Sequence, residues 1–171
     1  NQVTIYPERL DIPSRWRNPR RVFVNSMSDL FHPDVPDGFI ADVWQTMFTE
    51  YRHTYLILTK RPDRMKQWVD QMLEGCMGRV FSNIWLGVSV ENQAIADERI
   101  PLLMQVPAAV RFVSVEPMLG PVDLNAAGHD FMCHCDGCLD LLSSDLNMWE
   151  ARRIDWVICG GETGPGARPV H

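Results

Sequence analysis

The 171-residue sequence is long enough to bury the core of one domain, and its hydrophobic (46%) and charged (22%) fractions exclude a disordered chain. No apolar run approaches the ~20 residues of a membrane helix, and the first residues lack a signal-peptide pattern. The net charge of −6 argues against a broad basic surface for nucleic acid. We therefore expect a soluble, cytoplasmic domain with no membrane segment.

Two strand-helix units open the pattern. An apolar run at residues 22–25 predicts a strand, and Asp37 is placed to cap a helix whose apolar residues recur every three or four positions. Residues 55–58 predict a second buried strand. The helix that follows it has Pro62 in its first turn, where proline is tolerated.

Three further strands are predicted at residues 84–90, 110–115 and 154–159. A weaker helix follows the first of these, and Pro101 is expected to split or restart it because proline lacks a backbone N–H. Residues 120–153 break the alternation, and we interpret them as a peripheral insertion. The chain opens with Asn1 and stops soon after the last strand, so we also expect it to be a fragment of a longer protein.

Strands that alternate with helices predict an α/β fold with a parallel sheet, because parallel neighbours need a long crossover. A partial TIM-like barrel and an open doubly wound sheet both fit this alternation. No glycine-rich dinucleotide fingerprint follows the first strand, which favours the partial barrel. We predict one domain over residues 1–171, with about five strands in chain order.

Polar residues follow every predicted strand, and ligands of parallel α/β folds bind at the carboxyl ends of strands. The predicted small-molecule site comprises Asn25, Ser26, Asp29, Thr59, Lys60, Ser89, Glu91, Asn92, Glu116, Gly160, Gly161 and Glu162. The glycines permit close backbone approach to an anion, although a flexible loop has the same composition. Singly, Asp29 and Asn92 also fit helix caps, and Lys60 a solvated charge. The recurrence after five strands is what indicates a site.

A cysteine cluster lies inside the predicted insertion. Cys133, Cys135 and Cys138 are too close together for a secreted disulfide framework, which favours a reducing cytoplasm. Thiolates and imidazole suit structural zinc, with His129 or His134 as the fourth ligand. The second Cys-x-x-Cys arm of many zinc sites is missing, so a reduced loop without metal is the alternative.

The segment Arg15 to Arg21 combines cations with an aromatic ring, Trp16. Such a segment could hold a phosphate or stack on a base, which would make a local nucleic-acid contact. The alternative is a solvated lead-in to the first strand, with Trp16 packed under a helix. The acidic remainder of the chain favours that alternative.

Five ordered motifs resemble those of a known family. They lie at residues 21–32, 58–62, 86–92, 115–117 and 160–162. The chain resembles the bacteriophage gp-thirty-seven/gp-sixty-eight family, a phage and bacterial family of uncharacterised function. Members carry an upstream three-cysteine motif that makes them similar to radical S-adenosylmethionine enzymes, in which three cysteines bind a [4Fe-4S] cluster at the mouth of a partial barrel.

The resemblance implies that the full-length protein binds S-adenosylmethionine and a [4Fe-4S] cluster. The implied pocket residues are Ser26, Asp29, Thr59, Lys60, Glu91, Asn92 and Glu116. The sequence begins after the position of the cysteine motif, and neither Cys76, Cys159 nor the Cys133 cluster replaces it. We therefore expect no radical chemistry from this chain alone.

Two other functions remain open from the residues. Carboxylates of Asp29, Glu91, Glu116 and Glu162 could hold Mg²⁺ or Mn²⁺ for hydrolysis, because hard cations prefer carboxylate oxygens. Alternatively, the chain is a nonenzymatic binding module that uses the strand-end residues or the Arg15 to Arg21 segment to hold a partner.

Overall fold

The five strands pair in the order in which they occur along the chain, and every pair is parallel. The structure is a computed structural model that describes residues 3–25, 27–75, 80–124, 153–162 and 165–168. Its elements are η1 (Pro7–Arg9), η2 (Pro13–Arg15), β1 (Arg21–Val24), α1 (Asp37–Thr49), β2 (Thr54–Thr59), α2 (Pro62–Gly75), β3 (Ile84–Ser89), α3 (Gln93–Gln105), β4 (Val110–Val115) and β5 (Trp156–Cys159).

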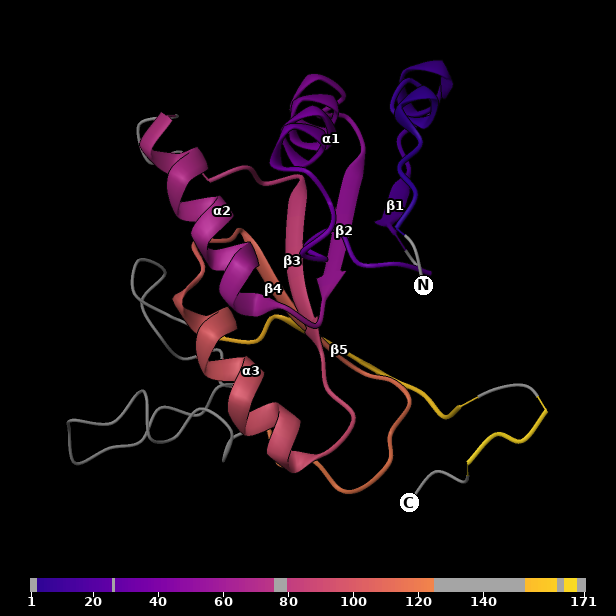
Figure 1. Ribbon diagram of the computed structural model, residues 1–171, viewed down its shortest axis with the longest axis vertical. Helices are drawn as coiled ribbons and strands as arrows, with labels where there is room; N and C mark the ends of the chain where they lie inside the picture. The colour runs from indigo at the N-terminus through magenta and orange to yellow at the C-terminus, as the bar shows by residue number, and fades with distance from the viewer. Residues whose placement is uncertain (1–2, 26, 76–79, 125–152, 163–164, 169–171) are drawn as a thin grey trace.

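The sheet curls into a half-barrel (Figure 1). Each strand-helix-strand step moves to the next strand in the same direction, and right-handed crossovers then place the helices on one face of the sheet. The predicted α/β fold, the parallel sheet and the partial barrel are confirmed. Among the described residues, no helix is both long enough and apolar enough to cross a membrane.

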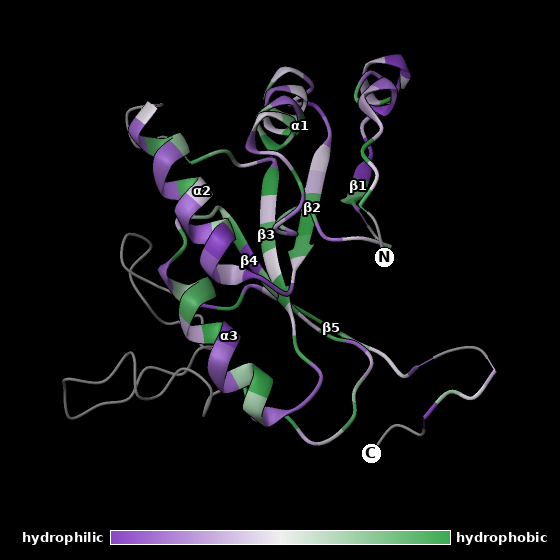
Figure 2. Ribbon diagram, in the orientation of Figure 1, coloured by the Kyte–Doolittle hydropathy of each residue, from purple (hydrophilic) through white to green (hydrophobic). Residues whose placement is uncertain are grey.

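The main core lies between the helices and one face of the sheet. Alternate strand residues such as Ile57, Leu86 and Val113 point to this face and are at most 2% exposed. The helices supply matching stripes, including Ile40 and Met65, which are fully buried. Figure 2 shows the hydrophobic residues concentrated on the strands, with hydrophilic positions along the outer sides of α2 and α3.

The opposite, open face of the half-barrel carries an aromatic layer near the amino ends of the strands. Phe112 packs edge-on against Phe23 and lies tilted against Trp156, which in turn meets Trp85 edge-on. Phe112 is fully buried because its ring lies over Gly87, its partner in the β3–β4 register. A Cβ atom at Gly87 would lie 2.7 Å from that ring, so only glycine fits there.

Two local predictions about helices are wrong. Asp37 is the first residue of α1 and Pro36 is the N-cap, without a side-chain capping bond. Pro101 lies inside α3, which continues through it from Gln93 to Gln105. Burial of Ile100 and Leu103, both fully buried, offsets the cost of the lost hydrogen bond, about 3 kcal/mol for a proline inside a helix. Pro62 lies in the first turn of α2 as predicted.

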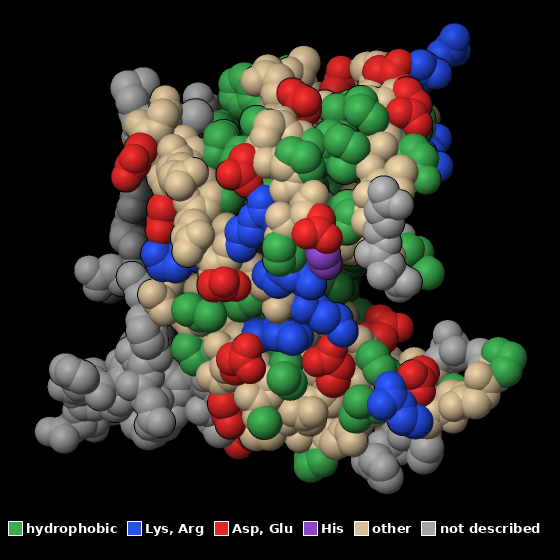
Figure 3. Space-filling view, in the orientation of Figure 1, with side chains coloured by type: hydrophobic (Ala, Val, Ile, Leu, Met, Phe, Trp, Pro, Cys, Tyr) green, Lys and Arg blue, Asp and Glu red, His purple; other side chains and the backbone are tan. Residues whose placement is uncertain are grey.

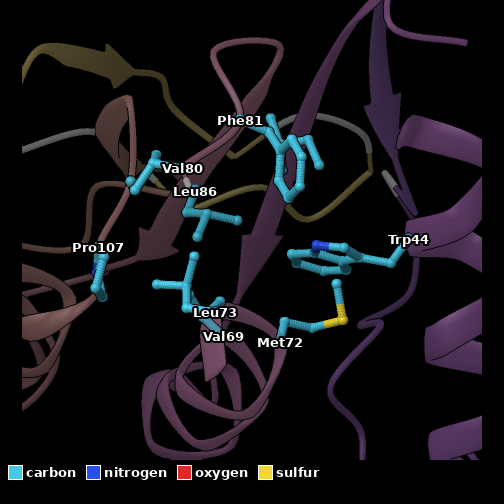
Figure 4. A pocket seen from close by; sticks show the side chains of 10 residues that line it. Trp44, Val69, Met72, Leu73, Val80, Phe81, Leu86 and Pro107 are labelled. Carbon is cyan, nitrogen blue, oxygen red and sulfur yellow. The ribbon is translucent and has the colours of Figure 1, made fainter. Parts of the chain in front are cut away.

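A small apolar crevice opens on the helical side of the sheet (Figure 4). It is lined by Trp44 from α1, Val69 and Met72 from α2, Phe81 before β3, and Leu86 within β3. Its lining is apolar apart from the Trp44 indole N–H and carries no charged side chain. It is a gap in the core packing rather than the candidate site.

Candidate functional site at the carboxyl edge of the sheet

The carboxylate of Asp29 joins the loop after β1 to the loop after β2. Its Oδ1 atom accepts hydrogen bonds from Thr59 Oγ1 (2.7 Å) and the Phe31 amide (2.9 Å). Its Oδ2 atom accepts from the Lys60 amide (3.0 Å) and the Arg61 guanidinium (2.7 Å). Both oxygens are therefore fully engaged within the chain, and Asp29 acts as a structural anchor for the two loops.

Arg64 holds the same β1–α1 loop from the side of α2. Its guanidinium donates to the carbonyls of His32 and Val35 and forms an ion pair with Asp37. Figure 3 shows Lys and Arg side chains gathered at the centre of this face, near the start of α2. The loop is fixed by these cations, and Thr59 is 1% exposed beneath it.

At the end of β3, one carboxylate faces two cations. Lys60 Nζ lies 2.5 Å from Glu91 Oε1, and an Arg99 guanidinium nitrogen lies 3.5 Å from Glu91 Oε2. Arg99 also donates to the Ser89 carbonyl, which holds α3 against the strand end. In the described part of the chain one positive charge is left in excess at this point, because a single carboxylate, Glu91, pairs with both Lys60 and Arg99.

At the end of β4, the charge that lacks a partner among the described residues is negative, the carboxylate of Glu116. Its side chain is exposed, and none of the described residues donates a hydrogen bond or ion pair to it. The carboxylate lies against Gly160, where a Cβ atom would come within 3.0 Å of Glu116 Oε1. The backbone of Gly160 is fixed on both sides, by Val115 and by Met118. A negative charge without a partner among the described residues therefore lies beside β5.

Two serines lie between these charged groups. Ser89 and Ser114 are register partners in β3 and β4, and both are at most 4% exposed. Glu91 follows the end of β3 and Glu116 follows the end of β4, so both lie at the carboxyl edge of these neighbouring strands. Small hydroxyl side chains beside an excess cation and an anion that has no partner among the described residues are groups that orient a polar small molecule.

The remaining predicted site residues fall into different roles. Asn25 follows β1 in the left-handed region, with φ of 60°, and its carbonyl accepts from the Ser28 amide. Asn92 is the N-cap of α3, and its side chain accepts from the Ile95 amide. Gly161 lies half-buried after β5.

Glu162 closes the loop after β5 by binding Arg168. The Arg168 backbone amide and guanidinium donate three hydrogen bonds to its carboxylate, at 2.8 to 2.9 Å. These bonds, the side-chain ones first, lower the pKa of Glu162 from its usual value to about 2. Glu162 is thus paired within its own loop and does not join Glu116.

Several predicted metal ligands lie outside the described residues. Cys133, Cys135, Cys138, His129 and His134 belong to this group, as does Ser26 of the small-molecule site. In the part of the chain that the structure describes, no three His, Cys, Asp or Glu side chains cluster in a way that could hold a metal ion. The four carboxylates of the Mg²⁺ hypothesis are not brought together as one group there.

Sequence reasoning missed three contributors: Arg64, Arg99 and Gly87. Arg99 lies on α3 at a position flanked by core residues, three after Ala96 and one before Ile100, and this unusual placement of a charge was the available signal. Gly87 follows no turn pattern, and only its neighbour Phe112 across the sheet explains it.

The fold and this edge define a class: a parallel (βα) half-barrel with a polar, charge-separated group at the carboxyl ends of β3 and β4. Residues 1–171 match the family described as "Protein of unknown function (DUF5131)", and the chain belongs to that family. No curated protein and no solved structure matches the chain.

Proposed function

We propose that this half-barrel binds a zwitterionic small molecule at the carboxyl edge of β3 and β4, with S-adenosylmethionine as the candidate ligand. The observation that carries the proposal is the charge separation across two neighbouring strands. Counting the described residues alone, an excess cation lies at Lys60 and Arg99, and a carboxylate without a partner lies at Glu116. An α-amino acid group carries the complementary pair, a carboxylate and an ammonium.

Other residues at the same edge of the sheet suit the remaining groups of the ligand. Ser89 and Ser114 offer hydroxyls that suit polar groups of a nucleoside, and the Gly160–Gly161 backbone allows close approach. The resemblance to radical S-adenosylmethionine proteins supports this choice among zwitterionic ligands. That the chain is related to the bacteriophage gp-thirty-seven/gp-sixty-eight family is itself something we propose.

The proposal covers binding and not reductive chemistry. A [4Fe-4S] cluster is held by cysteine thiolates and would supply the electron for homolytic cleavage. The cysteine within the described ranges is Cys159, exposed at the end of β5, so those residues do not supply the ligand set of a cluster.

The test compares two ligands and two variants by calorimetry and thermal shift. Glu116→Gln should weaken binding of S-adenosylmethionine about tenfold, because the ammonium loses its counter-charge. Binding of methylthioadenosine, which lacks the amino acid group, should not change. Glu98→Gln makes the same chemical change on the exposed side of α3 and should leave both affinities unaltered. If S-adenosylmethionine at about 1 mM does not raise the melting temperature, the proposal fails.

A further inference from the structure

Four exposed arginines near the start of the chain lack a carboxylate partner among the described residues: Arg9, Arg17, Arg20 and Arg21. The other described lysines and arginines, Arg111 apart, each form an ion pair with a carboxylate. Within the described ranges of a chain whose net charge is −6, cations without a carboxylate partner are thus gathered at residues 9–21. We call these four residues the arginine surface.

Three of the four guanidinium groups lie over aromatic rings. Arg20 lies 4.9 Å from the centroid of the Trp16 ring, and Arg21 lies 5.6 Å from that of Trp85. Arg9 lies 4.7 Å from the ring centroid of Tyr6, a side chain that is itself 47% exposed. A stacked guanidinium keeps its N–H donors in the plane and leaves its outer face open.

The surface is held in place by a buried histidine. His53 is fully buried, and its ring meets the Trp16 ring edge-on at 5.4 Å. Its Nδ1 atom accepts from the Arg20 amide (3.1 Å), so its Nε2 atom donates to the Pro13 carbonyl (3.0 Å). Trp16 therefore packs on His53 and under Arg20, and the segment is fixed to the start of β2.

The arginine surface lies at the amino edge of the sheet, opposite the candidate small-molecule site. The Thr54 amide, at the start of β2, donates to the Arg20 carbonyl. Figure 1 shows the amino-terminal segment beside the amino ends of the strands, and in Figure 3 blue side chains stand over it at the upper right. A ligand bound here would not compete with one bound at Glu116.

We propose that the arginine surface binds single-stranded nucleic acid. Unstacked bases pack on aromatic rings and on guanidinium planes, while arginine donors reach the phosphates. Arg20 on Trp16 and Arg21 on Trp85 are neighbours in the chain, and each offers a stacked guanidinium for these functions. An acidic peptide would require the charge alone, and the stacked rings would then have no part in recognition. The acidic remainder of the chain confines the contact to this segment.

The test measures fluorescence anisotropy of a labelled single-stranded oligonucleotide with the full chain over a range of salt concentrations. Replacing Arg20 and Arg21 by glutamine should lower the affinity at least tenfold and reduce the salt slope by about 1.4, which corresponds to two phosphate contacts on a single strand. Arg20→Lys keeps the charge but loses the planar stack, and should lower the affinity about threefold. Circular dichroism checks that each variant is folded.

Lys66→Gln combined with Arg153→Gln is the matched control, because it removes two cations that already have carboxylate partners. That variant should bind like the parent chain. The proposal is overturned if no oligonucleotide binds at low salt, or if both double variants weaken binding equally. It is also overturned if a polyglutamate chain competes as well as the oligonucleotide, since a purely electrostatic surface for acidic protein would then be the better description.

Discussion

The two ends of the carboxyl edge carry the same residue types in different states. Beside β1 and β2, Asp29 accepts four hydrogen bonds from the chain itself. Beside β4 and β5, Glu116 receives none from the described residues and lies on a glycine. A carboxylate whose acceptors are all occupied holds the fold together, whereas an open one remains able to bind a ligand.

Between these ends, Glu91 is intermediate. Its side chain is 14% exposed and faces both Lys60 and Arg99, so it is paired without exhausting the positive charge around it. The number of donors around each strand-end carboxylate therefore separates loop anchors from candidate ligand contacts. The following experiments test that separation.

The largest expected effect is on stability. Asp29→Asn should lower the free energy of unfolding by about 3 kcal/mol, because it removes the charge facing Arg61 and an acceptor for the Lys60 amide. Glu116→Gln should change it by no more than about 0.5 kcal/mol. Urea unfolding followed by circular dichroism measures both.

Asp42→Asn, on an exposed position of α1, is the control for the Asp29 substitution and should be close to neutral. Equal losses for Asp29→Asn and Glu116→Gln would contradict the comparison. In that case the two carboxylates would have the same structural role.

A smaller effect is expected at Gly160. An alanine Cβ there would lie 3.0 Å from Glu116 Oε1 and 3.1 Å from its Cδ, so the exposed Glu116 side chain must turn away. We expect Gly160→Ala to destabilise the chain by less than about 1 kcal/mol. It should weaken S-adenosylmethionine binding about threefold in calorimetry, because the carboxylate is displaced.

Gly38→Ala provides the control for Gly160→Ala, since no atom lies within 4 Å of a Cβ atom at Gly38, in the first turn of α1. It should be neutral or slightly stabilising, because alanine favours the helix. Unchanged ligand affinity in Gly160→Ala would show that the position of Glu116 over Gly160 has no part in binding.

Most of the fold was predictable because the signals are local. The apolar run of β2 and the helical stripe that begins at Met65 each identify their own element, and the strand order follows from the alternation. Pro101 was misjudged because its local preference is outweighed by the burial of Ile100, which depends on contacts with the sheet. The strand register, which places Phe112 beside Gly87, cannot be predicted from one strand alone because it depends on how two strands pair.

The sequence predicted which positions lie at the candidate site, but not which of their side chains are occupied by hydrogen bonds within the chain. Thr59 and Arg61 reach Asp29 from 30 and 32 residues away, and no pattern near Asp29 reveals that its oxygens are occupied. Asn92 was open to two interpretations from its sequence, and the structure shows it capping α3. That Glu116 has no partner within the described ranges likewise depends on which donors the fold brings near it.

The smallest expected effect concerns Glu162, whose carboxylate is paired with Arg168 at an exposed site. Its pKa of about 2 lies below the usual 4.5, because Arg168 donates hydrogen bonds to the charged form. The stabilisation from this pair is fully present above pH 4.5 and is lost as the pH falls toward 2. Arg168→Gln keeps the backbone donor, so it should raise the pKa of Glu162 only part of the way to 4.5. Arg168→Lys, which keeps the charge, should raise it less.

An NMR titration of the Glu162 side chain, assigned with Glu162→Gln, measures these midpoints. Melting temperatures of the parent chain and Arg168→Gln should differ above pH 4.5 and converge near pH 2. An unchanged midpoint in Arg168→Gln would mean that the guanidinium does not hold this carboxylate in solution. Glu162 would then resemble Glu116, and the β5 end of the edge would offer two open carboxylates instead of one, which would favour a ligand with more positive charge than a single ammonium.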